Sequence, residues 1–189
     1  NLLVGEQPGC SQQVALACRR AAAYYMVPEP TGAKCVPPDS PAIRAALKLD
    51  IVVIGAGQAG LSTAYPLRQA GLVPGRDFLV LDAAARPGGA WQYRWPSLTL
   101  STVNRVHDLP GMSFAESAGG DASVQAAVAV PAYFAAYERH FDLQVLRPAN
   151  VSLVCSRGTR LRVETDRGLF SARGLVNATG TWEKPFIPA

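Results

Sequence analysis

The stretch DIVVIGAGQAG, residues 50–60, places four β-branched residues directly before a loop of the pattern GxGxxG. Valine and isoleucine favour strands, so this apolar run predicts a buried strand that ends where the glycines begin. Residues 61–69 have the composition of a helix, and the apolar residues 78–81 predict a second strand that ends before Asp82. A strand, a glycine loop, a helix and a second strand together predict a βαβ unit in a parallel sheet.

Each glycine of the loop has its own expected task. Gly55 permits the tight turn after the strand, Gly57 lets a pyrophosphate approach the main chain, and Gly60 lets the helix pack closely on the sheet. The helix N-terminus would face the phosphates with its unpaired N–H groups. Asp82, 22 residues beyond Gly60, would accept hydrogen bonds from ribose hydroxyls. The pattern predicts a dinucleotide site; the alternative is a glycine turn that binds no nucleotide.

Composition narrows the class of protein. The 189 residues are 49% hydrophobic, which is enough for one sizeable domain. The net charge is +4, but the arginines are scattered, so we expect no nucleic-acid partner. Neither a membrane span nor a secretory signal is apparent. We expect a cytoplasmic protein that acts on a small-molecule substrate and has no membrane partner; its oligomeric state is not indicated.

Cysteine and histidine spacing gives no sign of a metal site. The residues in question are Cys10, Cys18, Cys35, Cys155, His107 and His140. They contain no CxxC pair and no zinc-like arrangement, so no metal is predicted. We interpret the cysteines as buried or surface thiols; the alternative, a redox disulfide, requires two of them to meet in space, which a sequence does not show.

Residues 1–48 differ in character from the rest of the chain. A helix is compatible with residues 12–26, but the prolines between positions 28 and 41 break any regular element. We interpret residues 1–48 as a proline-rich lead-in or the tail of an upstream module. The chain starts at Asn1 and stops shortly after an apolar strand, so we interpret both ends as cut.

Two loops follow the βαβ unit. The run RPGGAW, residues 86–91, contains a proline and two glycines and predicts irregular structure. Residues 92–110 are rich in aromatic, small and hydroxyl side chains, and we interpret them as a loop that lines a site. The alternative is a surface loop whose Trp91 packs on the core.

The second half of the chain predicts one helix and several short strands. The helix is expected at 131–140, with Pro131 in its first turn, where a missing N–H matters little. The strands are expected at 143–146, 151–155, 160–165, 169–172 and 174–180. Glycine-containing turns between the middle three indicate an antiparallel meander. The last strand should return to the sheet beside the first. The predicted fold is α/β, a Rossmann-like parallel sheet with an inserted antiparallel β-meander.

Four motifs in this order resemble the flavin-containing monooxygenase group of two-dinucleotide-domain flavoproteins, over roughly residues 50–188. The motifs are GAGQAG at 55–60 with Asp82, GGAW at 88–91, WPSLTLST at 95–102, and NATGTW at 177–182 followed by Pro185 and Pro188. Each motif alone is a weak signal, but the four in the expected order make a chance match improbable.

The resemblance implies an FAD site. The residues that it implies are Gly55, Gly57, Gln58, Ala59, Gly60, Asp82, Ala83, Gly88, Gly89, Trp91, Ser101, Thr102, Val151, Ala178, Thr179 and Gly180. The loop at 55–60 would hold the pyrophosphate, Asp82 the adenosine ribose, and the main chain of Val151 the adenine. The GGAW segment would lie along the pyrophosphate and flavin. Thr179 and Gly180 match the turn that leads to a nicotinamide-binding domain.

The implied chemistry is that of the flavin. In the family, NADPH reduces FAD, the reduced flavin reacts with oxygen, and a C4a-peroxyflavin oxygenates a small organic substrate. Ser101 and Thr102 are flavin-proximal candidates, and no catalytic side chain is assigned. Residues 49–189 are interpreted as an FAD-binding domain truncated before the NADPH-binding domain. The alternatives are an NAD-dependent single-domain dehydrogenase and a non-catalytic or incomplete nucleotide-binding fragment.

Overall fold

A computed structural model describes residues 46–117 and 121–182 of the chain. The helix expected at 12–26 and the proline-rich segment up to residue 45 lie outside the described residues. Among the described residues, the first strand begins at Leu47.

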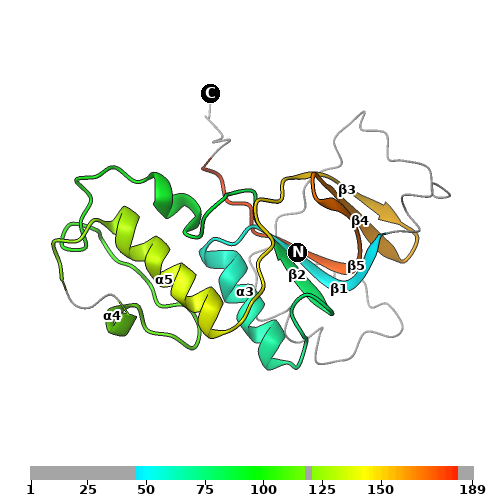
Figure 1. The fold of residues 1–189 in the computed structure, drawn as a ribbon, viewed down its shortest axis with the longest axis horizontal. Coiled ribbons are helices and arrows are strands. Elements are labelled where there is room, and N and C mark those ends of the chain that lie inside the picture. Colours follow the sequence, from blue (N-terminus) through cyan, green and yellow to red (C-terminus); the bar gives the residue numbers. More distant parts are fainter. Residues whose placement is uncertain (1–45, 118–120, 183–189) are drawn as a thin grey trace.

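The strands form one mixed sheet with the order β2-β1-β5-β4-β3 (Figure 1). The strands are β1 (Leu47–Ile54), β2 (Phe78–Leu81), β3 (Val151–Arg157), β4 (Arg160–Thr165) and β5 (Gly168–Asn177). Strand β1 pairs in parallel with both β2 and β5. Strand β4 pairs antiparallel with both β3 and β5. The prediction of a parallel sheet joined to an antiparallel meander, with the last strand beside the first, is therefore confirmed.

Three helices and one short 3-10 helix connect these strands. They are α3 (Gln58–Gln69), α4 (Phe114–Ser117), α5 (Ala126–His140) and the 3-10 helix η1 (Gly89–Tyr93). Helix α3 leads from β1 to β2 and continues for three residues beyond Pro66. In Figure 1, α3 lies between the sheet and α5.

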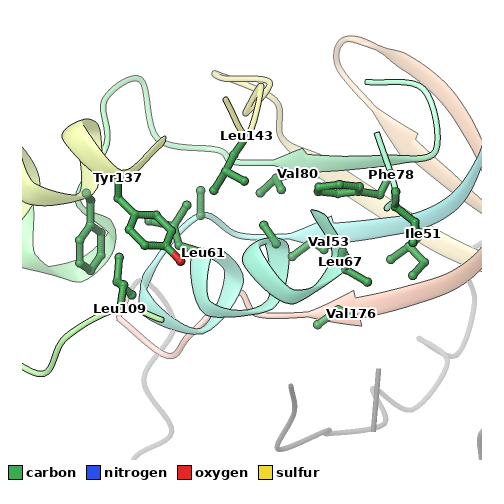
Figure 2. Close-up of a cluster of buried hydrophobic side chains, with 14 of the residues drawn as sticks. Ile51, Val53, Leu61, Leu67, Phe78, Val80, Leu109, Tyr137, Leu143 and Val176 are labelled. Carbon is green, nitrogen blue, oxygen red and sulfur yellow. The ribbon is translucent and has the colours of Figure 1, made fainter. Parts of the chain in front are cut away.

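The core fills both faces of the central strands. Ile51 and Val53 of β1 belong to a first core cluster, which includes side chains of α3 and α5, whereas Val52 belongs to a second cluster on the other side of the sheet. Figure 2 shows Val53 and Val80 gathered near Leu67 of α3. Burial on both faces explains why the central parallel strands are continuous apolar runs rather than alternating ones.

Two tyrosines of α5 fasten a loop to this core. The hydroxyl of Tyr133 accepts a hydrogen bond from the Leu109 N–H at 2.7 Å and donates one to the Met112 carbonyl at 2.6 Å. The hydroxyl of Tyr137 donates to the Pro110 carbonyl at 2.7 Å. Burial raises the pKa of Tyr137 far above its ordinary value, so the hydroxyl stays protonated and remains a donor.

Strand β5 corrects the prediction of two separate strands at 169–172 and 174–180. The structure has a single strand from Gly168 to Asn177. Its first part pairs with β4 as far as Ala172. Strand β1 pairs with most of its length, Gly174 included, so the ladder with β1 keeps the strand extended through Gly174.

The strand predicted at 143–146 is also wrong. Of these four residues, only Leu146 forms a β-bridge, which pairs it in parallel with Leu81, the last residue of β2. Asp142 and Gln144 have φ angles of 46° and 49°, which interrupt the extended conformation that a strand requires.

Helix α5 begins five residues before Pro131, so the prediction of Pro131 in the first turn is wrong. The residues before it are mostly alanine and valine, and alanine has the highest helix propensity. The 3-10 helix η1 likewise starts at Gly89, inside the loop predicted to be irregular. Cys155 of β3 is disulfide-bonded, which corrects the interpretation as a thiol, and the other three cysteines lie outside the described residues.

We expect Tyr133→Phe to lower the free energy of unfolding by about 1–3 kcal/mol, because it leaves a buried N–H and a carbonyl without their partner. Urea unfolding measures this change. The matched control is Tyr93→Phe, since Tyr93 is 51% exposed, and it should change the stability by less than about 0.5 kcal/mol. Equal effects of the two substitutions would contradict this role of Tyr133.

Candidate functional site

Three turns meet at the carboxyl end of β1. A Cβ atom on Gly55 would lie 2.3 Å from the carbonyl oxygen of Ala178, and one on Gly89 would lie 2.9 Å from the Cα atom of Gly57. The turns after β1 and β5 and the glycine pair Gly88-Gly89 at the start of η1 are therefore in close main-chain contact. Strand β1 has β2 on one side and β5 on the other, and ligands of open α/β sheets bind where the strand order reverses in this way.

Two of the loop glycines are required by the protein itself. Gly55 has a φ of 101°, a conformation that side chains disfavour, and it packs against Ala178. A Cβ atom on Gly60 would lie only 1.8 Å from the Gly55 carbonyl oxygen. These contacts agree with the expected tasks of the tight turn and of close packing between α3 and the sheet.

Gly57 is different, because the protein leaves room for a side chain there. Its φ of −80° and ψ of −167° suit any residue. Within residues 46–117 and 121–182, the nearest atom to a Cβ at this position would be the Gly89 Cα atom at 4.0 Å, an ordinary van der Waals distance. Helix α3 starts directly after Gly57 and has no side-chain cap. The N–H groups of Gln58, Ala59 and Gly60 thus have no acceptor within the helix, which suits an anion at this point.

The GGAW segment joins this cluster through its glycines. Gly88 has a φ of 125°, and a Cβ there would lie 2.7 Å from Pro131 of α5. Trp91 is partly buried against the first core cluster, with the Arg94 guanidinium 5.5 Å from its ring centroid. The interpretation of Trp91 as a residue that packs on the core therefore agrees with the structure.

Ser101 and Thr102 lie in an exposed turn with Thr99. The Thr99 hydroxyl is 2.7 Å from that of Ser101, and the Thr102 hydroxyl accepts a hydrogen bond from the Thr99 N–H at 3.0 Å. The main chain of Ser101 donates to the Ala122 carbonyl at 2.9 Å. In the described part of the chain, these hydrogen bonds connect residues 99–102 with one another and with the segment before α5. None of them connects this turn with Gly55, Gly57 or Gly89.

The remaining predicted residues lie at the ends of strands. Ala178 donates its N–H to the Ile54 carbonyl at 2.8 Å, so the turn after β5 stays beside β1. Thr179 bonds to the Asn177 side chain, and Gly180 has a φ of 67°. Val151 begins β3 and packs against the second core cluster.

Asp82 directly follows β2 and is buried, whereas the adjacent Ala83 is exposed. Its carboxylate oxygen Oδ2 lies 3.2 Å from Nη2 of Arg147, and the same guanidinium also pairs with Glu138 of α5. Sequence reasoning did not identify Arg147 or Glu138. One signal in the sequence pointed to Arg147, because it directly follows an apolar segment. An arginine that becomes buried in such a place requires a carboxylate partner.

No helix within residues 46–117 and 121–182 is long and apolar enough to cross a membrane. The same residues contain no cluster of three or more His, Cys, Asp or Glu side chains suited to a metal ion.

We expect Gly60→Ala to destabilise the fold by at least about 2 kcal/mol, because the new methyl group would collide with the Gly55 carbonyl. Urea or thermal unfolding measures the loss. Gly174→Ala is the matched control, since its Cβ would lie 3.8 Å from the nearest atom. A Gly60→Ala variant as stable as this control would show that α3 can move away from the turn.

Comparison with known proteins gives a consistent assignment. The model of the pyridine nucleotide-disulphide oxidoreductase family matches residues 52–189. The chain is 33% identical over 140 residues to the uncharacterized oxidoreductase CzcO of Bacillus subtilis strain 168, a match that covers 74% of this chain and 39% of CzcO. The chain thus spans about two fifths of the length of the curated relatives that it matches.

Solved structures agree with this assignment. A flavin-containing monooxygenase from Stenotrophomonas maltophilia is 41% identical with a TM-score of 0.63, and the match covers 75% of this chain and 41% of that one. An oxidized steroid monooxygenase bound to NADP is 28% identical with a TM-score of 0.55, and the match covers 70% and 26% of the two chains. The resemblance found in the four motifs is confirmed, and the chain belongs to the pyridine nucleotide-disulphide oxidoreductase family, among its flavin-containing monooxygenase-like members.

Proposed function

We propose that this chain binds FAD where the turns after β1 and β5 meet the glycine pair Gly88-Gly89. The observation that carries the proposal is the space at Gly57. Gly55 and Gly60 are explained by contacts within the protein, but a Cβ at Gly57 would meet no atom of the described residues closer than 4.0 Å. A glycine that the fold does not require, at the start of an uncapped helix, is what a pyrophosphate needs in order to reach the main chain.

The residues present fit this cofactor. The N–H groups at the start of α3 and the positive end of its dipole favour the diphosphate without a basic side chain. The main chain of Gly89, which also carries no side chain, lies next to Gly57. Asp82, at the end of β2, offers a carboxylate for the hydroxyl groups of the adenosine ribose.

The bound flavin would supply the redox and oxygen chemistry, and the protein would supply its position and a dry environment. The complete protein is proposed to be a flavin monooxygenase that takes its electrons from NADPH and oxygenates a small organic substrate. This is supported by the similarity to the Stenotrophomonas maltophilia monooxygenase and to the steroid monooxygenase bound to NADP. Ser101 and Thr102 are proposed to lie near the flavin ring.

We expect Gly57→Ala to raise the dissociation constant of FAD by about tenfold or more, because the new methyl group would occupy the place where the pyrophosphate approaches the main chain. Overpacking by one methyl group costs about 1–3 kcal/mol, which corresponds to this change in affinity. The free energy of unfolding should change by less than about 1 kcal/mol, because alanine accepts this backbone conformation. Titration of the apoprotein with FAD, followed by flavin fluorescence, and urea unfolding measure the two effects.

Gly174→Ala is the control and should bind FAD like the unaltered chain, since Gly174 lies within β5 and has ordinary space around it. If the unaltered chain binds NAD but not FAD, the proposed FAD site is refuted and an NAD-dependent dehydrogenase is supported instead. If Gly57→Ala retains full affinity for FAD, the pyrophosphate does not bind at this glycine.

A further inference from the structure

One guanidinium joins the end of β2 to helix α5. Nη2 of Arg147 lies 3.2 Å from Oδ2 of Asp82, and Nη1 and Nη2 lie 2.5 Å and 2.8 Å from the two carboxylate oxygens of Glu138. The side chains are only 11–12% exposed. A buried ion network of this kind holds its members in place firmly, because a member without its partner would be a buried, unpaired charge.

The main chain around Arg147 holds Asp82 as well. The Asp82 N–H donates to the Leu146 carbonyl at 3.0 Å, and the Asp82 carbonyl accepts from the Ala149 N–H at 2.8 Å. The segment 146–149 therefore contacts Asp82 through both main-chain groups and through the carboxylate. The bond between the Asp82 N–H and the Leu146 carbonyl belongs to the parallel bridge between Leu81 and Leu146, so this segment extends the pairing of β2 by one residue.

The two carboxylates share Arg147 unequally. Glu138 takes both nitrogens in a forked pair, whereas Asp82 takes one nitrogen through Oδ2. From the described residues, the other oxygen of Asp82, Oδ1, receives only a long contact of 3.4 Å from the Ala84 N–H. Because a carboxylate oxygen has two acceptor sites, Oδ1 can accept a further hydrogen bond.

The cation in this network is permanent. Burial alone would lower the pKa of Arg147, but the hydrogen bonds and charges of Glu138 and Asp82 outweigh it, so the pKa is raised. Among the described residues, these two carboxylates are the charged groups that the structure pairs with Arg147.

We infer that Arg147 is a positioning residue that occupies Oδ2 of Asp82 and thereby directs Oδ1 to the 2′-hydroxyl of the adenosine ribose. The inference rests on the proposed FAD site. Glu138 anchors the guanidinium so that it cannot turn and bind both oxygens of Asp82. Arg147 does not touch the cofactor; it acts through Asp82.

The test compares FAD with an FAD analogue that carries 2′-deoxyribose in its adenosine half. The ratio of the two dissociation constants, measured by flavin fluorescence with the 189-residue chain, reports the hydrogen bond to the 2′-hydroxyl. In the unaltered chain the analogue should bind roughly tenfold or more weakly, since a hydrogen bond to a charged group contributes about that much. Asp82→Ala should bring the ratio close to one.

We expect Arg147→Met to lower this ratio at least threefold or so, because the Asp82 carboxylate is no longer held. A purely structural role would weaken binding of both ligands alike and leave the ratio unchanged. Arg147→Lys is the second variant, since it keeps the charge but not the fork that reaches both carboxylates, and it should also lower the ratio. The matched control is Arg76→Met, which breaks the exposed pair of Arg76 with Asp77 and should not change the ratio.

Arg147→Lys decides the question if Arg147→Met does not fold. An unchanged ratio in every folded Arg147 variant would overturn the inference, and so would an unaltered chain that binds FAD and its deoxy analogue equally. A chain that binds neither ligand would instead refute the proposed FAD site, so the two failures are distinguishable.

Discussion

The distance between Gly60 and the Gly55 carbonyl sets the geometry of the whole site. A Cβ on Gly60 would lie 1.8 Å from that oxygen, so only glycine lets α3 come this close to the turn after β1. The close approach aims the N-terminus of α3 at the edge where β1 and β5 end. It also places Leu61 and Leu67 in the first core cluster with Val53. The core and the candidate site therefore depend on the same contact.

The glycines of one motif can be separated by what they contact. Gly55 and Gly60 pack closely against other main-chain atoms of the chain, so the fold alone would require a glycine at each position. At Gly57, by contrast, no contact among the described residues requires a glycine, because a Cβ there would lie no closer than 4.0 Å to any of their atoms. A glycine motif is weak evidence of binding when all its members have structural reasons. Here one member has none, and this gives the family assignment a physical basis in the chain itself.

Local patterns predicted most of the fold. The β-branched run before the glycines predicted β1, and the apolar residues before Asp82 predicted β2, because propensity and burial act over a few neighbouring residues. Residues 143–146 alternate like a strand, but the positive φ angles at Asp142 and Gln144 depend on packing that no local pattern encodes. The pair of Arg147 and Asp82 joins residues 65 positions apart, so no local pattern predicts which carboxylate Arg147 meets.

Strand β5 pairs with β1 on one side and with β4 on the other. It also ends at the turn that touches Gly55. The meander is therefore not an independent appendage, since its third strand is also a strand of the parallel part of the sheet. Opening β5 would break the ladders on both sides and withdraw Ala178 from the glycine turn. The meander and the parallel strands should thus behave as a single cooperative unit, in which the rigidity of one is supported by the hydrogen bonds of the other.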